Sequence, residues 1–344
     1  MTDSSPSTLW GTAPHARQDL HAQRDLQVDA FCVGEDTLLD HVLLPFDLRA
    51  TAAHARGLGR VGVLRVEDVH RLDEALSELL AEWERGTFRI RPEQEDGHTA
   101  IEAALTERLG ELGKKVHTAR SRNDQVLVAL RLFALDRLQR LDDALVELAQ
   151  SFEARAQEAD AAGLTMPGYT HGQPAMPLPA SMWARSFRDA LADDRRVVAV
   201  ARSLHDQSPL GSASGFGPPI PLDREGTARD LGFTRVQENP VYCQQSRLKL
   251  EAFALAACAQ VAWTLGQFAC DGLSFTAKAY GFMRLPDGLT TGSSLMPNKR
   301  NPTCWSCCGR CIRRSRPTRQ RSACWGRGLA VATTATFSSA NAPS

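Results

Sequence analysis

Apolar residues recur along this chain with the spacing of amphipathic helices. Between about residues 125 and 160 they return at three- to five-residue steps with charges between them, which predicts a long amphipathic helix. Leu72, Leu76 and Trp83 share one face of a helix expected over 68–85. Similar patterns predict helices over about 180–205 and 245–276, and two short helices separated near Pro45.

Glycine and proline mark the interruptions between these helices. Residues 167–179 and 209–221 are rich in both and predict loops, and residues 278–302 predict a mixed loop. Alternation typical of strands is scarce, and aromatic residues make up only 6% of the chain. The pattern therefore predicts a mainly α fold, with long helices packed in a bundle and functional loops between them.

Composition changes this picture only when the chain is divided. The 344 residues carry 40 basic and 40 acidic side chains, which argues against a dedicated binder of polyanions. After Pro302, however, 42 residues contain seven arginines and no acid, so the part before them has a net charge of −7. Five of the nine cysteines also lie in this tail. The whole-chain averages therefore describe neither part.

The apolar and cysteine-containing segments also bear on location. The polar N-terminus supports neither secretion nor an N-terminal anchor, and the free thiols favour a reducing compartment. Residues 252–270 form the longest apolar stretch, but polar residues interrupt it. A helix buried among other helices is the preferred interpretation, with a membrane span as the alternative.

Three polar segments between the helices carry the candidate chemistry. The first, Ser121-Arg-Asn-Asp-Gln-Val126, follows Arg120, so it offers two guanidinium groups and an amide suited to binding carboxylates. Ser121 or Asn123 is also a suitable cap for the helix that follows. The alternative is a capped helix start with solvated charges.

The other two segments combine polar groups with turn-forming residues. In Gly168-Tyr-Thr-His-Gly-Gln173, Thr170 and Gln173 lie close to His171 and are suited to hold an imidazole or a substrate. The segment Gly292-Ser-Ser-Leu-Met-Pro-Asn-Lys-Arg-Asn-Pro302 supplies a hydroxyl, an ammonium and an amide that together can stabilise negative charge. An exposed histidine and a basic surface turn are the respective alternatives.

In combination, these segments resemble a known family. The third matches every fixed position of the signature loop of the fumarase/aspartase superfamily, Gly-Ser-Ser-x-Met-Pro-x-Lys-x-Asn-Pro. Within that superfamily, the first two resemble the argininosuccinate lyases. Weaker agreements occur in the same order, and the resemblance extends from about residue 30 to Pro302; they include Phe46-Asp47, Ala53-His-Ala55, Glu95-Asp-x-His-Thr99, Ser208-Pro-Leu-Gly211 and Asp223-Arg-Glu225.

The resemblance implies an architecture. It is a long helical bundle of the fumarase/aspartase type with a smaller helical N-terminal domain. The expected domains are residues 1–115, an incomplete central bundle over 116–302, and an aberrant tail over 303–344. The family assembles as homotetramers whose active sites combine loops from three subunits, so the three segments need not meet within one chain.

The resemblance also implies a reaction. Argininosuccinate lyases are carbon–nitrogen lyases of arginine biosynthesis that release arginine and fumarate by anti β-elimination, without a cofactor or metal. Ser293 corresponds to the general base, and Lys299 and Asn301 to the groups that hold the charged carboxylate. His171 corresponds to the acid side or a proton relay. The matching substrate-binding positions are Arg122, Asn123, Thr170 and Gln173, with Arg247 on a looser alignment. A cytoplasmic enzyme without nucleic-acid or membrane partners is expected.

The tail departs from the family pattern. Family members continue after the signature loop with a helix of the type Asp-Val-Leu-Glu-Leu-Leu-Arg, whose glutamate partners the histidine of the second segment. Written as GAC GTG CTG GAG CTG CTG CGG and read one base later, that helix becomes the observed Thr303-Cys-Trp-Ser-Cys-Cys-Gly309. A later family segment, Tyr-His-Arg-Asp-Leu-Gln, becomes Thr333 to Ser338 in the same way. We therefore expect a one-base loss near the Pro302 codon, and a shortened, impaired C-terminus.

Other interpretations remain open at this point. The paired Cys-x-x-Cys spacings of the tail suit zinc, but their shared Cys-Cys junction makes a poor tetrahedral site. The arginines of the tail favour nucleic-acid binding only if its frame is genuine. Another lyase of the superfamily, acting on adenylosuccinate, aspartate or malate, and a non-catalytic, crystallin-like or remnant protein are the alternatives for function.

Overall fold

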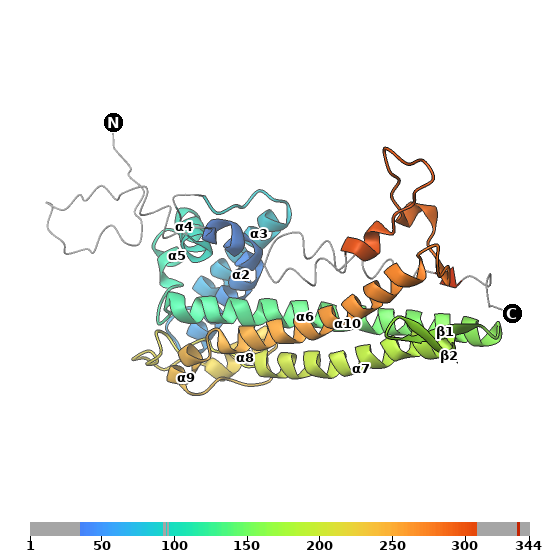
Figure 1. Ribbon diagram of the computed structural model, residues 1–344. Helices are drawn as coiled ribbons and strands as arrows, with labels where there is room; N and C mark the ends of the chain where they lie inside the picture. The colour runs from blue at the N-terminus through green and yellow to red at the C-terminus, as the bar shows by residue number, and fades with distance from the viewer. Residues whose placement is uncertain (1–34, 92–93, 95, 308–335, 338–344) are drawn as a thin grey trace, which may run out of the picture. The chain divides into compact units, whose positions relative to one another are not determined.

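The computed structural model describes residues 35–91, 94, 96–307 and 336–337 (Figure 1). Their contacts divide the chain into two compact units. Unit 1 comprises residues 1–136 and 204–251, and unit 2 comprises residues 137–203 and 252–344. Helices predominate in both, which confirms the mainly α prediction. The domain boundaries expected at residues 115 and 302 stay predictions.

Unit 1 is built from short and medium helices around two apolar cores. Its helices are α2 (Asp36–Arg60), α3 (Val66–Glu84), α4 (Gly97–Leu109), α5 (Glu111–Lys115), α8 (Arg224–Leu231), α9 (Pro240–Gln245) and the first part of α6 (Arg122–Ala161). One core joins α2 to α3, α4 and α5, and the other joins α2 to α6 and α8. Helix α2 thus contributes apolar residues to both cores.

Helix α2 continues through Pro45, so the prediction of two short helices was wrong. Proline has no N–H, which leaves the carbonyl of His41 without its helical partner. The indole N–H of Trp83 on α3 donates to this carbonyl over 3.0 Å and replaces the missing bond. Leu44 and Leu48, on either side of the proline, are buried in the same core. Tertiary contacts therefore outweigh the local preference of proline.

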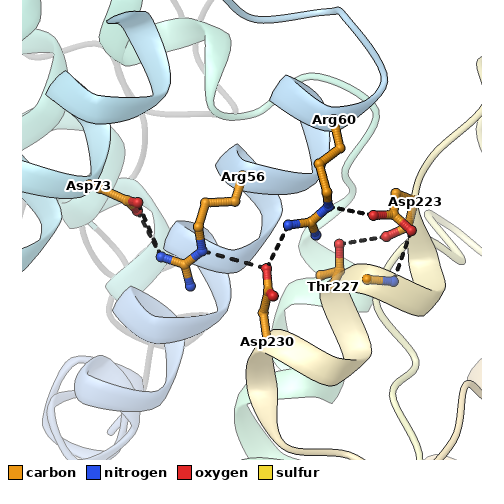
Figure 2. A network of polar contacts seen from close by, with 7 residues as sticks. Arg56, Arg60, Asp73, Asp223, Thr227 and Asp230 are labelled. Carbon is orange, nitrogen blue, oxygen red and sulfur yellow. Dashed lines mark hydrogen bonds and ion pairs between the residues drawn. The ribbon is translucent and has the colours of Figure 1, made fainter. Parts of the chain in front are cut away.

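Arginines of α2 bind acidic residues of two neighbouring helices (Figure 2). Arg56 donates to Asp73 of α3 over 3.0 Å, and it shares Asp230 of α8 with Arg60. Arg60 also donates to Asp223, whose carboxylate caps α8 through the N–H of Gly226. These side chains are about one quarter to two fifths exposed, so each pair contributes roughly 0–1 kcal/mol. The network therefore orients α3 and α8 relative to α2 but adds little to the stability of the fold.

Unit 2 is a bundle of three long helical segments. It contains the later part of α6, most of α7 (Ala180–His205) and most of α10 (Lys249–Phe275), which run side by side in Figure 1. Their shared core is aromatic: the Phe268 ring lies 4.9 Å from Phe152 and 5.2 Å from Phe187, centroid to centroid. Helix α10 is apolar and long enough to cross a membrane, yet its core-facing residues, among them Ala257 and Val261, are buried. Helices α7 and α10 confirm the helices predicted over 180–205 and 245–276.

The segment predicted as a loop over 167–179 is instead a β-hairpin. Strand β1 (Thr165–Thr170) pairs antiparallel with β2 (Gln173–Pro179). The turn residues His171 and Gly172 both have positive φ, 53° and 74°, as a two-residue turn of type I′ requires. Prolines obscured the pattern in the sequence, but a two-stranded ribbon tolerates them because its outer edges need no partner. A second short pair joins β3 (Met283–Arg284) to β4 (Thr336–Phe337).

Candidate active site

The first polar segment begins helix α6. Ser121 Oγ accepts from the N–H of Asn123 over 3.3 Å, so the predicted serine cap forms. Arg122 is paired with Asp96, the N-cap residue of α4, over 3.0 Å. Asn123 is half-buried, and its carbonyl accepts a 3.4 Å hydrogen bond from Arg247. Two predicted binding residues from distant parts of the chain thus meet here.

Asp124 holds this segment in place. Its buried carboxylate accepts three backbone hydrogen bonds, from Ser121 over 3.0 Å, Gly211 over 3.0 Å and Ala213 over 2.9 Å. Burial raises the pKa of Asp124, and the three N–H donors oppose that rise by favouring the charged form. The carboxylate joins the start of α6 to the loop at 211–213, where Gly211 and Ala213 have positive φ.

A pocket of about 320 Å³ lies beside these residues, within unit 1. Arg122, Asn123 and Arg247 line its polar side, and Val126, Leu130, Leu248 and Glu251 complete it. Two guanidinium groups at one pocket suit the binding of carboxylates. Leu248 has a positive φ of 64°, an unusual conformation for a leucine, in the turn that presents Arg247 between α9 and α10. The sequence reasoning missed Glu251, which carries no motif and was found only through its position.

The partly buried His98 is linked to Arg122 through acidic residues. His98 Nδ1 is 2.5 Å from Asp47 Oδ2. Burial of the ring lowers the pKa of His98, but the carboxylates of Asp47, Asp96 and Asp40 outweigh burial, so the net shift is upward. Asp96, which caps α4, also pairs with Arg122, so this acidic cluster links the histidine to the binding segment. The sequence suggested these positions only as weak agreements with the family.

The second polar segment forms the tip of the β1–β2 hairpin. Thr170 and Gln173 are the last paired residues, and His171 occupies the first turn position between them. All three side chains are exposed. Within the described part of the chain, no hydrogen bond or ion pair engages the imidazole, so its nitrogens are open to a substrate or another subunit.

The third polar segment is a closed loop in unit 2. Backbone hydrogen bonds between Thr291 and Asn301, of 3.0 and 2.8 Å, join its two ends. Ser293 Oγ accepts from the N–H groups of Leu295 over 3.3 Å and Met296 over 3.2 Å. Because both groups donate toward the hydroxyl oxygen, they would stabilise an alkoxide at that position. This arrangement suits a serine that gives up its proton.

The two other predicted groups of this loop differ in how they are held. Asn301 Nδ2 donates to the carbonyl of Gly292 over 3.4 Å, which orients the amide across the loop. The side chain of Lys299 is exposed, and no described residue binds its ammonium group. Lys299 is therefore available to an anion. No hydrogen bond or ion pair between described residues joins this loop to His171, and Arg122, Asn123 and Arg247 belong to the other unit.

The described residues give no support to a metal site. They contain no group of three or more histidine, cysteine or acidic side chains arranged for a metal ion. Of the cysteines in the zinc-like spacings, Cys304 and Cys307 are free and partly buried, whereas Cys308 and Cys311 lie outside the described residues.

Comparison with known proteins places this chain in one class, the lyases. A family model described as "Lyase" matches residues 30–309. An argininosuccinate lyase of Thermotoga neapolitana is 46% identical over 81% of this chain and 69% of its own length, and one of Sorangium cellulosum is 48% identical over 81% and 64%. The chain belongs to the argininosuccinate lyase family of the fumarase/aspartase superfamily.

Solved structures agree on the fold. An EDDS lyase in complex with formate superposes with a TM-score of 0.77 at 21% identity, over 90% of this chain and 66% of that one. A fumarate lyase, delta crystallin, from Brucella melitensis bound to cobalt gives a TM-score of 0.69 at 20% identity, over 81% and 66%. The chain thus spans about two thirds of the length of the relatives it matches. The family match also ends at residue 309, shortly after the signature loop.

Proposed function

We propose that the body of this chain is an argininosuccinate lyase, which splits argininosuccinate into arginine and fumarate in arginine biosynthesis. The observation that carries the proposal is the loop in which Ser293 accepts two backbone N–H groups, with Asn301 nearby and with Lys299, whose ammonium group no described residue binds. Relatives named argininosuccinate lyase at 43–48% identity support this substrate over others of the superfamily.

The difficult step is the removal of a proton from the carbon beside a carboxylate. Ser293 takes this proton as the general base, and the N–H groups of Leu295 and Met296 stabilise its alkoxide. The electron pair left on carbon delocalises into the carboxylate, which then carries two negative charges. Lys299 and Asn301 bind that carboxylate, and each such donor contributes roughly 3 kcal/mol to lowering the barrier.

The carbon–nitrogen bond then breaks, and the departing guanidinium nitrogen needs a proton. His171 supplies it, directly or through a relay, from its turn at the hairpin tip. Thr170 and Gln173 flank it as binding residues. Arg122, Asn123 and Arg247 bind the carboxylates of the substrate at the pocket beside α6. No cofactor or metal enters this scheme.

The enzyme acts as a homotetramer in the cytoplasm, with each site completed by loops of several subunits. Exposed apolar side chains on α10, among them Leu255 and Trp263, support burial against another copy of the chain. Among the described residues, no hydrogen bond or ion pair joins His171 to the Ser293 loop, which fits a site shared between subunits. Nucleic acid and membrane have no role in the proposal.

The tail after Pro302 is translated out of frame. The shifted reading reproduces Thr303 to Gly309 and Thr333 to Ser338, and the family match ends at residue 309. The shift removes the glutamate that partners His171 in the family, so we expect impaired activity from the 344-residue chain. Resequencing the DNA around the Pro302 codon tests this part directly, because a closed downstream frame would mark a genuine remnant.

Activity is tested in a chain whose frame has been restored. It should release fumarate from argininosuccinate, which is followed by ultraviolet absorbance. Ser293→Ala should abolish release, whereas Ser294→Ala, in the same loop but without a described hydrogen bond, should retain it. Equal activity of the two variants would contradict the role of Ser293. Preference for adenylosuccinate, aspartate or malate would reassign the substrate.

A further inference from the structure

Trp305 is the most deeply buried aromatic residue near the candidate base. Its side chain is 1% exposed, and its ring meets Phe268 of α10 edge-on, at 4.7 Å between centroids and 82°. A Cβ atom on Gly272 would lie 2.7 Å from Trp305 Cε2. The indole therefore lies against the backbone of α10 at a position where glycine leaves the necessary room.

The same cluster holds both ends of the loop that carries Ser293. Before the loop, Leu285 and Leu289 pack in the core that contains Trp305. After the loop, residues 303–307 form a helical turn, and Cys304 Sγ donates to the carbonyl of Leu289 over 3.2 Å. Between these anchors, residues 294–300 are exposed and touch no core. The loop is thus exposed along its length, and only its two ends are anchored to the core.

We propose that Trp305 is a positioning residue, which fixes the two ends of the 291–302 loop against α10 and so sets the place of Ser293, Lys299 and Asn301. The family helix has leucine at this position, so the shifted frame still supplies a large apolar side chain there. The claim concerns the position of the loop in the 344-residue chain and is independent of catalysis, because the frame-restored chain has leucine at 305.

Hydrogen exchange measured by mass spectrometry on the full chain, without substrate, tests the proposal. The backbone N–H groups of Thr291 and Asn301 close the loop, so their exchange reports its base. Trp305→Ala should speed their exchange about tenfold while exchange along α7 is unchanged. Trp305→Phe should restore most of the protection. Phe216→Ala, which removes an 87% exposed aromatic side chain from unit 1, is the control and should change neither.

A substitution that adds a methyl group at Gly272 provides a second test, which leaves Trp305 unchanged. Gly272→Ala should displace the indole and speed exchange at Thr291 and Asn301. In the Trp305→Ala background the same alanine should have no further effect, because the clash is gone.

Two results would overturn the proposal. One is loop exchange in Trp305→Ala within about twofold of the unchanged chain. The other is an equal increase across α7, α10 and the loop, which would mean that Trp305 holds the bundle as a whole. Because no substrate is present, failure here is distinguishable from failure of the lyase assay.

Discussion

Asp124→Asn tests how the first polar segment is held in place. The carboxylate accepts three backbone N–H groups, one at Oδ1 and two at Oδ2. Asparagine has the same shape but only one acceptor oxygen. In the better orientation of the asparagine amide, its oxygen still accepts the hydrogen bonds from Gly211 and Ala213. The amide nitrogen then faces the N–H of Ser121, which loses its acceptor. One hydrogen bond is lost in the folded protein, and the other two become uncharged.

The expected loss of stability follows from these contacts. A hydrogen bond to a charged group contributes about 1.5–3 kcal/mol, and the two remaining bonds weaken as well. Removing a charge whose pKa is raised by burial offsets part of this loss. We therefore expect the free energy of unfolding to fall by about 2–3 kcal/mol.

Urea unfolding followed by circular dichroism measures the change. Glu111→Gln is the control, because the Glu111 side chain is 83% exposed and its removal should alter stability by less than about 0.5 kcal/mol. A loss in Asp124→Asn no larger than in this control would refute the assignment of Asp124 as the anchor of the segment.

Three further predictions concern stability. Burial and the charge of Arg120 lower the pKa of His54 to about 3. Between pH 6.5 and 3 only the unfolded ring gains a proton, so the stability of the fold should fall as the pH drops through this range. Thermal unfolding of His54→Gln should depend less on pH over the same range. The pKa of His98 is raised, so this residue stabilises the fold fully below pH 6.5 and loses that effect as the pH rises through its pKa in the folded protein. His98→Gln should lack this loss of stability in the same pH series. Phe268→Ala should lower the free energy of unfolding by about 3–5 kcal/mol in urea, whereas the half-exposed Phe253→Ala should cost less than about 1 kcal/mol.

Local sequence patterns predicted the long helices well, because amphipathic periodicity reflects which face is buried. They failed at Pro45 because the compensating donor, Trp83, is distant in sequence. They also failed at residues 165–179, where prolines and a positive φ at His171 conceal a hairpin. Both errors concern contacts or backbone conformations that no periodicity encodes.

The sequence predicted those residues of the candidate site that lie within continuous motifs. Ser293, Lys299 and Asn301 were found because they share one continuous loop. The hydrogen bond of Arg247 to Asn123 and the ion pair of Asp96 with Arg122 depend on tertiary packing, so local patterns indicate them weakly or not at all. The burial of Trp305 is hidden for another reason: the shifted frame carries no family pattern, although Cys304 and Trp305 belong to the core of unit 2.

The most direct test of the central claim is fumarate release from argininosuccinate, measured side by side for the 344-residue chain and the chain with its frame restored. We expect sustained release by the restored chain, its loss in Ser293→Ala, and weak or no release by the 344-residue chain. No release by a folded, restored chain would contradict the proposed activity, and equal release by both chains would contradict the proposed damage to the tail.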